Sequence, residues 1–171
     1  MNYAKINTVD VANGPGVRVS LFVSGCKHHC KGCFNEVAWD FNYGEPFTDE
    51  VFEILEKHLS KPYISGLTIL GGEPLDPKNI HQVANIVTKM KTTYPHLNIW
   101  VYTGYTFEYL RTSSSYNMAA LYNILDNIDV LVDGPFIESQ KDLTLKFRGS
   151  SNQRLIDIKM SKKHNKIITI E

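Results

Sequence analysis

Short apolar runs alternate along this chain with stretches in which apolar residues recur at helical spacing. The runs rich in β-branched and apolar residues, each typical of a buried strand, are 17–23, 66–70, 98–102 and 129–133. Helical patterns lie between them, with Thr48 and Asn79 at the expected starts of two helices. The alternation predicts a parallel sheet with right-handed crossover connections.

Roughly four or five parallel strands are too few to close a barrel of the eight-stranded kind. We therefore expect an α/β fold with an open sheet, a partial parallel β/α barrel. After residue 154 the segments 155–160 and 167–170 alternate and predict a β-hairpin. A chain of 171 residues suits one domain. Its predicted parts are a partial barrel, 1–154, and a C-terminal β-hairpin extension of the same domain, 155–171.

The composition excludes several classes of partner. Eighteen Lys and Arg residues balance eighteen Asp and Glu residues, so no strong field would steer the protein to nucleic acid or to an anionic membrane. No apolar stretch approaches the roughly 20 residues that a membrane helix needs. The N-terminus lacks the pattern of a secretory signal, and three clustered cysteines make no disulfide framework. We expect a soluble, cytoplasmic protein.

The cysteines are the strongest chemical feature. Cys26, Cys30 and Cys33 follow the first predicted strand in the stretch SGCKHHCKGCFN, and the chain has no other cysteine. A short loop with this spacing can surround one face of an iron–sulfur cluster and would leave one iron of a 4Fe-4S cluster without a protein ligand. A closed zinc site with His28 or His29 as fourth ligand is the alternative, and spacing alone does not decide.

Two further stretches follow predicted strands. Gly71 and Gly72 let the backbone approach a ligand closely, and Glu73 adds a carboxylate that would attract an ammonium group, although such a stretch is also an ordinary turn. Thr103 and Gly104 follow the third strand, where ligand contact and simple turn formation are both open. Residues 148–153 are rich in hydrogen-bond donors and form either an ordinary loop or a segment that binds a partner or cofactor.

The cysteine loop followed by Gly-Gly-Glu-Pro after the next strand resembles the radical S-adenosylmethionine (SAM) superfamily. The stretch NGPGVR at 13–18 is similar to the start of glycyl-radical-enzyme activases. Residues 100–105, 130–136 and 148–153 resemble the activating proteins of anaerobic ribonucleoside-triphosphate reductases. The resemblance covers nearly the whole chain up to Arg154 and implies the partial barrel of radical SAM enzymes.

The resemblance implies a ligand set. Cys26, Cys30 and Cys33 would bind three irons of a 4Fe-4S cluster, and the methionine part of SAM would occupy the fourth iron. The ammonium group of SAM would be held by the stretch Gly71, Gly72 and Glu73. Many members carry an aromatic residue before the third cysteine that contacts adenine. Gly32 stands there in this chain, so the adenine contact is expected from Gly32, Cys33 and Phe34.

The resemblance also implies an activity. The enzyme would cleave SAM reductively, and the 5′-deoxyadenosyl radical would take a hydrogen atom from a glycine of the large anaerobic reductase, leaving a glycyl radical there. No catalytic residue beyond the cluster and SAM is expected. A reduced flavodoxin-type protein would supply the electron. The resemblance does not decide whether the protein forms a homodimer or a heterotetramer with the reductase.

Three alternatives stand beside this interpretation. The chain could activate another glycyl radical enzyme, such as one of the formate-lyase type. It could be a small radical SAM enzyme of nucleoside biosynthesis. It could also be a non-catalytic Cys3His zinc module that binds proteins.

Overall fold

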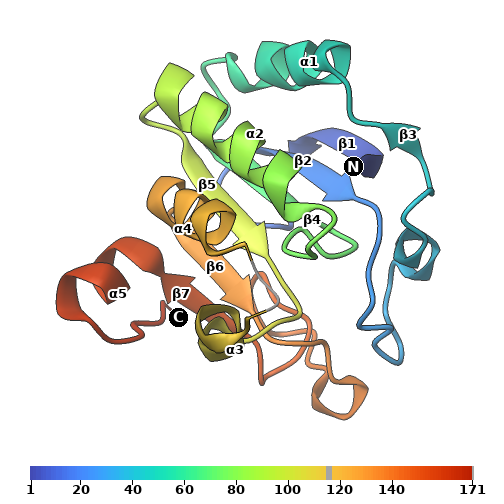
Figure 1. The fold of residues 1–171 in the computed structure, drawn as a ribbon, viewed down its shortest axis with the longest axis vertical. Coiled ribbons are helices and arrows are strands. Elements are labelled where there is room, and N and C mark those ends of the chain that lie inside the picture. The colour runs from blue at the N-terminus through green and yellow to red at the C-terminus, as the bar shows by residue number, and fades with distance from the viewer. Residues whose placement is uncertain (115–116, 171) are drawn as a thin grey trace.

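The structure, a computed structural model, describes residues 1–114 and 117–170. Within these residues the strands form one seven-stranded sheet in the order β3-β1-β2-β4-β5-β6-β7 (Figure 1). The parallel centre consists of β2 (Arg18–Val23), β4 (Gly66–Gly71), β5 (Asn98–Tyr102) and β6 (Val130–Asp133). The antiparallel edge strands are β1 (Asn2–Asp10), β3 (Glu45–Pro46) and β7 (Arg154–Asp157). The predicted open parallel sheet is confirmed.

Helices α1 to α4 connect the parallel strands as the sequence predicts, and α5 follows the last strand. They are α1 (Asp49–Leu59), α2 (Ile80–Thr93), α3 (Phe107–Thr112), α4 (Met118–Asn127) and α5 (Ile158–His164), with short 3-10 turns η1 (Glu36–Trp39) and η2 (Glu138–Gln140). Figure 1 shows α2 and α4 in front of the sheet. The hydroxyl of Thr48 accepts a hydrogen bond from the Val51 amide and caps α1 as expected. None of the helices in residues 1–114 and 117–170 has the length and apolar composition that a membrane-spanning helix needs.

The two faces of the sheet serve different purposes. Because successive side chains of a strand point to opposite faces, Ile69 and Val101 pack beneath the helices, against α2 and α4 residues such as Val87. Trp100 belongs to a separate cluster with Val132 on the opposite face. That second face is the one that borders the candidate site.

Arg18 links the amino ends of three central strands through hydrogen bonds. Its guanidinium is fully buried at the start of β2. It donates hydrogen bonds to Thr68 Oγ1 at 2.7 Å and to the carbonyl oxygens of Leu67 and Asn98 at 2.9 and 2.8 Å. Burial lowers the pKa of Arg18 to about 10, so the group stays charged at neutral pH. One side chain therefore holds β2, β4 and β5 together at the end opposite the cysteine loop.

The C-terminal segment differs from the predicted β-hairpin. Strand β7 continues into helix α5, and Asp157 caps that helix by accepting a hydrogen bond from the Met160 amide at 2.8 Å. The chain then returns to the strand, where the Ile170 amide bonds the Leu155 carbonyl at 2.8 Å. Two strand-like segments do pair, but a capped helix with basic residues in its last turn replaces the turn between them. Glu171 lies outside the described residues.

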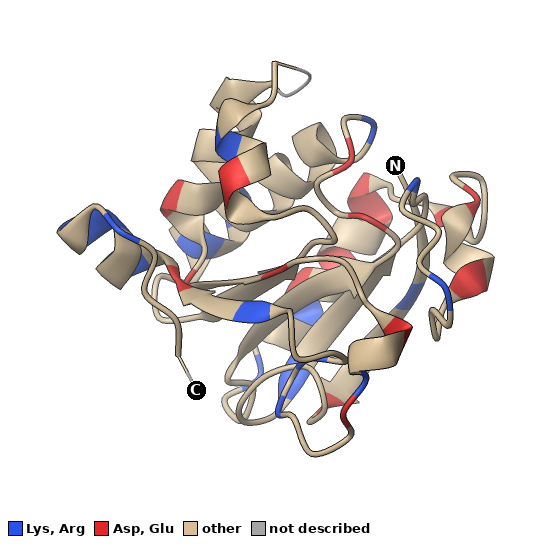
Figure 2. Cartoon of the chain, turned by 90° about the horizontal axis from the view of Figure 1, so that it is seen from below, with Lys and Arg blue, Asp and Glu red and all other residues tan. Residues whose placement is uncertain are grey.

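The charges of the molecule are mixed. Figure 2 shows Lys and Arg interspersed with Asp and Glu along the whole chain, in keeping with the net charge of zero.

Candidate functional site

A cavity of about 440 Å³ lies at the carboxyl ends of the parallel strands. Its walls include every residue that the sequence singled out for cluster or SAM binding: Cys26, Cys30, Cys33, Gly32, Phe34, Gly71, Gly72 and Glu73. Thr103 and Gly104 from the end of β5 line it as well. The carboxyl edge of a parallel sheet is where α/β folds bind ligands, and a volume of this size suits a small organic cofactor. The structure thus brings the three predicted loops together, while the role of each residue stays a prediction.

The cysteine loop presents three thiols to this cavity. Cys26 is buried, and Cys30 and Cys33 are partly exposed. Backbone amides point at the sulfurs: those of His28 and His29 at Cys26, and that of Asn35 at Cys33 Sγ with a distance of 3.4 Å. Amide donors of this kind stabilise the sulfurs of iron–sulfur clusters and tune their reduction potential. The donor set therefore fits a cluster held from one side.

Burial raises the pKa of the Cys26 thiol to about 11 and also raises the pKa of Cys30. Without a metal both groups are therefore protonated at neutral pH. Cluster assembly must displace these protons, since only the thiolate binds iron.

Both histidines that could complete a zinc site have other partners. The Nε2 atom of His28 lies 3.0 Å from Glu73 Oε2. The ring of His29 stacks on Trp39, with ring centres 4.5 Å apart and planes at 21°. Among residues 1–114 and 117–170, no group of three or more His, Cys, Asp or Glu side chains is arranged to hold a metal ion. Because His28 contacts Glu73 and His29 stacks on Trp39, the structure shows neither histidine placed as the fourth ligand of a zinc site.

The two glycines at the end of β4 allow close packing against β2 and the start of the cysteine loop. A methyl group on Gly72 would lie 2.6 Å from the Gly25 carbonyl oxygen, and one on Gly71 would lie 2.6 Å from the Val23 amide nitrogen. Gly71 also adopts a φ of +114°, which side-chain-bearing residues avoid. The Glu73 amide donates to the Gly25 carbonyl at 2.8 Å. The sequence suggested that these glycines make room for a ligand, but in the structure they make room for the backbone of residues 23–25.

Glu73 is buried, and its carboxylate accepts three hydrogen bonds and lies within hydrogen-bonding distance of His28. Oε1 accepts from the Leu75 amide at 2.9 Å and from Thr103 Oγ1 at 2.8 Å. Oε2 accepts from the Gly104 amide at 2.7 Å and lies 3.0 Å from His28 Nε2. The carboxylate therefore joins the cysteine loop to the ends of β4 and β5.

Asn79 is a structural residue that sequence reasoning misjudged in part. It occupies the N-cap position of α2 as predicted, but its side chain makes no capping hydrogen bond. Its buried Nδ2 instead donates to the carbonyl oxygens of Ser24 and Glu73, at 2.9 and 3.0 Å. The amide thereby ties the entry of the cysteine loop to the glycine-rich strand end.

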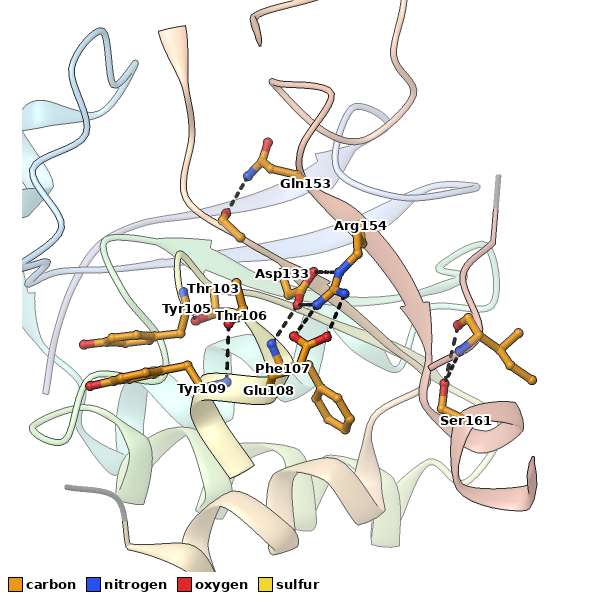
Figure 3. Close-up of polar contacts among 12 residues, drawn as sticks. Thr103, Tyr105, Thr106, Phe107, Glu108, Tyr109, Asp133, Gln153, Arg154 and Ser161 are labelled. Atoms are coloured by element: carbon orange, nitrogen blue, oxygen red, sulfur yellow. Dashed lines mark hydrogen bonds and ion pairs between the residues drawn. The ribbon is translucent and has the colours of Figure 1, made fainter. Parts of the chain in front are cut away.

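The segment between β6 and β7 forms the remaining wall of the cavity, which sequence reasoning only partly anticipated. Gln153 accepts from the amides of Gly149 and Ser150 at 2.9 and 3.1 Å. Its side-chain amide also donates to the Gly134 carbonyl at 3.1 Å (Figure 3). The donor-rich run 148–153 thus mainly folds the loop on itself. In doing so it places Arg148 beside the cavity.

An open parallel β/α sheet with a three-cysteine loop beside a glycine-rich strand end is the architecture of a single-cluster iron–sulfur protein of the radical SAM type. A family model described as a 4Fe-4S single cluster domain matches residues 12–156.

The anaerobic ribonucleoside-triphosphate reductase-activating protein of Enterobacteria phage T4 is 43% identical over 157 residues, which cover 91% of this chain and 93% of the relative. The proteins of that name from Escherichia coli (strain K12) and Vibrio cholerae are 41% and 43% identical over 155 residues, with 90% of this chain and 96% of each relative covered. The chain belongs to the family of anaerobic ribonucleoside-triphosphate reductase-activating proteins.

Proposed function

We propose that this protein is the activase of an anaerobic ribonucleoside-triphosphate reductase and works by 4Fe-4S radical SAM chemistry. The observation that carries the proposal is the cavity in which the three-cysteine loop and the Gly71–Glu73 strand end meet, within a chain of this family. The activity is an oxidoreductase reaction, and its product is a glycyl radical on the reductase.

Cys26, Cys30 and Cys33 are proposed to hold three irons, which leaves one iron for SAM. Backbone carbonyls at Gly71 and Gly72 would accept hydrogen bonds from the ammonium group of SAM. Glu73 would add its negative charge, since protein donors already fill its acceptor positions. Gly32, Cys33 and Phe34 would border the adenine.

The cluster, when bound, supplies the electron that cleaves SAM into methionine and the radical that removes hydrogen from glycine. The work of the protein is to orient SAM and keep water from the reacting atoms. The apolar walls contributed by Phe136, Leu145 and Phe147 serve the second purpose. The exposed side chains of Phe34 and Leu143 at the cavity leave the final closure to the partner.

The remaining assignments are proposals with less support. A reduced flavodoxin-type protein would donate the electron in the cytoplasm, where thiols stay reduced. The assembly would be a homodimer or a heterotetramer with the reductase, and balanced charge gives no reason to expect nucleic acid. Residues 155–171 would extend the same domain as 1–154, because Ile156 and Ile158 belong to its core.

Electron paramagnetic resonance (EPR) tests the activity. Reduced protein, SAM and the reductase are mixed without oxygen, and the expected result is a glycyl radical signal on the reductase. A parallel sample contains a glycyl radical enzyme of the formate-lyase type. A radical on that enzyme and none on the reductase would overturn the choice of substrate.

The ligand assignment has its own test. Cys30→Ala should lose the brown cluster absorbance and SAM cleavage together, because two thiolates cannot hold the cluster. His29→Asn is the matched control on the same loop and should keep both. SAM cleavage that persists in the Cys30 variant would reject the assignment.

A further inference from the structure

The side chain of His28 connects the cysteine loop to the opposite wall of the cavity. It lies between Cys26 and Cys30 in the sequence, and its Nε2 atom is 3.0 Å from Glu73 Oε2. The Glu73 side chain is 1% exposed and that of His28 is 19% exposed, so water competes weakly for this contact. The ring also packs edge-on against Tyr105, with ring centres 4.3 Å apart.

The end of β5 is shaped to receive this ring. A methyl group on Gly104 would lie 2.6 Å from His28 Cδ2, so the imidazole rests directly against the backbone that follows β5. The Gly104 amide donates to the same Glu73 oxygen at 2.7 Å. The imidazole, the carboxylate and the strand end therefore form one packed unit.

The direction of the hydrogen bond follows from the acceptor. Glu73 accepts from two backbone amides and from the hydroxyl of Thr103, an arrangement that suits the ionised carboxylate. An ionised carboxylate only accepts, so His28 Nε2 donates. A carboxylate has about four acceptor positions, and His28 fills the fourth.

We infer, on the basis of the proposed function, that His28 is a positioning residue for SAM binding. By donating to Glu73 it holds the segment that carries Cys26 and Cys30 against the end of β4, where Gly71 and Gly72 would receive the ammonium group. Residues that orient metal ligands through hydrogen bonds typically change metal affinity or activity by about 10-fold to 100-fold when they are removed. Histidine in this role orients a loop and binds no metal.

The test uses the full chain with its cluster reconstituted anaerobically. His28→Ala removes the donor, and His28→Gln restores an amide donor of similar reach. His29→Asn is the control, because His29 stacks on Trp39 and its left-handed backbone, φ +47°, tolerates asparagine. The readouts are iron content, the dissociation constant of SAM, and the change that SAM causes in the EPR spectrum of the reduced cluster.

We expect His28→Ala to bind SAM about tenfold more weakly and to show an altered SAM-bound spectrum, with His28→Gln recovering most of both and His29→Asn matching wild type. Unchanged SAM affinity and spectrum in His28→Ala would overturn the inference. Tighter SAM binding would also overturn it, because His28 would then occupy the place of the ammonium group. Should His28→Ala lose its cluster, a Gln variant with the same loss overturns the inference and a Gln variant that recovers supports it. A wild-type cluster that ignores SAM would instead reject the proposed function.

Discussion

Gly72 is the position where the cysteine loop and the strand end that faces it come closest. An added methyl group would lie 2.6 Å from the Gly25 carbonyl oxygen and 2.9 Å from that of Ala38, and neither backbone atom can move freely. The residue therefore controls how Cys26 sits beside the end of β4.

Gly72→Ala should lower the free energy of unfolding by about 1–3 kcal/mol, the usual cost of forcing a methyl group into packed atoms. It should also weaken SAM binding, because the cysteine loop must shift. Urea unfolding and SAM titration measure the two effects. Gly149→Ala is the control, since its methyl group meets side-chain atoms, the Phe136 ring at 3.1 Å and Gln153 Oε1 at 3.6 Å, which shift more easily than backbone atoms. Equal losses in both variants would contradict this account.

The residues around the cavity differ in how well the sequence alone predicts their roles. The eight residues singled out from the chain all line the cavity, because strand ends and cysteine spacing are local signals. The contact of His28 with Glu73 joins residues 45 positions apart and has no local signature. The same holds for Asn79, whose side chain reaches Ser24 instead of capping its own helix. Long-range polar contacts were therefore the part of the site that could not be predicted.

Elements that bury apolar runs were predictable. Strand β5 lies where its sequence pattern places it, and β4 extends its predicted run by one residue. Both strands were predictable because strands covered on both faces have nearly continuous apolar sequences. Helix α5 was not predictable from the sequence, because its seven residues show little periodicity and the Asp157 cap decides the structure. The wall formed by 134–153 was also missed as a wall, since it is held by hydrogen bonds between its own distant ends.

Strands β6 and β7 and helix α3 are joined by one charged cluster (Figure 3). Asp133, 1% exposed, accepts from Arg154 and from the Phe107 amide at 2.7 Å. Hydrogen bonds to Asp133 first, and then to the more exposed Glu108, raise the pKa of Arg154 above its usual range. The cluster anchors both ends of the segment that walls the cavity.

Arg154→Met should cost about 3 kcal/mol of unfolding free energy, because it leaves the buried Asp133 carboxylate with the Phe107 amide as its remaining donor in this cluster. Glu108→Gln should cost less than about 1 kcal/mol, since that pair is exposed to solvent. Chemical denaturation of both variants compares them. Similar costs would mean that the buried carboxylate does not dominate the cluster.

Asp129 links α2, α5 and the start of β5. Burial disfavours its charge, but hydrogen bonds from Lys159, the Ile99 amide and Lys91 outweigh burial and lower the pKa of Asp129. A carboxyl group with a lowered folded pKa contributes stability above its unfolded pKa of about 3.9. That contribution is lost as the pH falls through the folded value.

Asp129→Asn removes this titration. The stability difference between wild type and variant should therefore be largest near pH 7 and shrink below about pH 4. Urea unfolding of the metal-free proteins between pH 7 and pH 2.5 measures it, because acid would remove the cluster in any case. A difference that stays constant over this range would show that the charge of Asp129 adds nothing.

The molecule as a whole is built to be completed by a partner. Its helices cover one face of the sheet, while the cavity opens beside exposed apolar side chains, Phe34 at 83% and Leu143 at 88% exposure. Large exposed apolar residues around a cavity are typical of surfaces that bind another protein. A radical formed there needs protection from water, and a docked reductase would provide it. The open sheet is therefore consistent with a macromolecular substrate.

The central claim is that three cysteines hold a cluster whose remaining iron accepts SAM. EPR of the anaerobically purified, reduced protein, recorded while SAM is added, tests this most directly. The account predicts a 4Fe-4S signal that changes with SAM and saturates at one equivalent per cluster. A zinc-containing protein without such a signal, or a cluster whose spectrum ignores SAM, would contradict it.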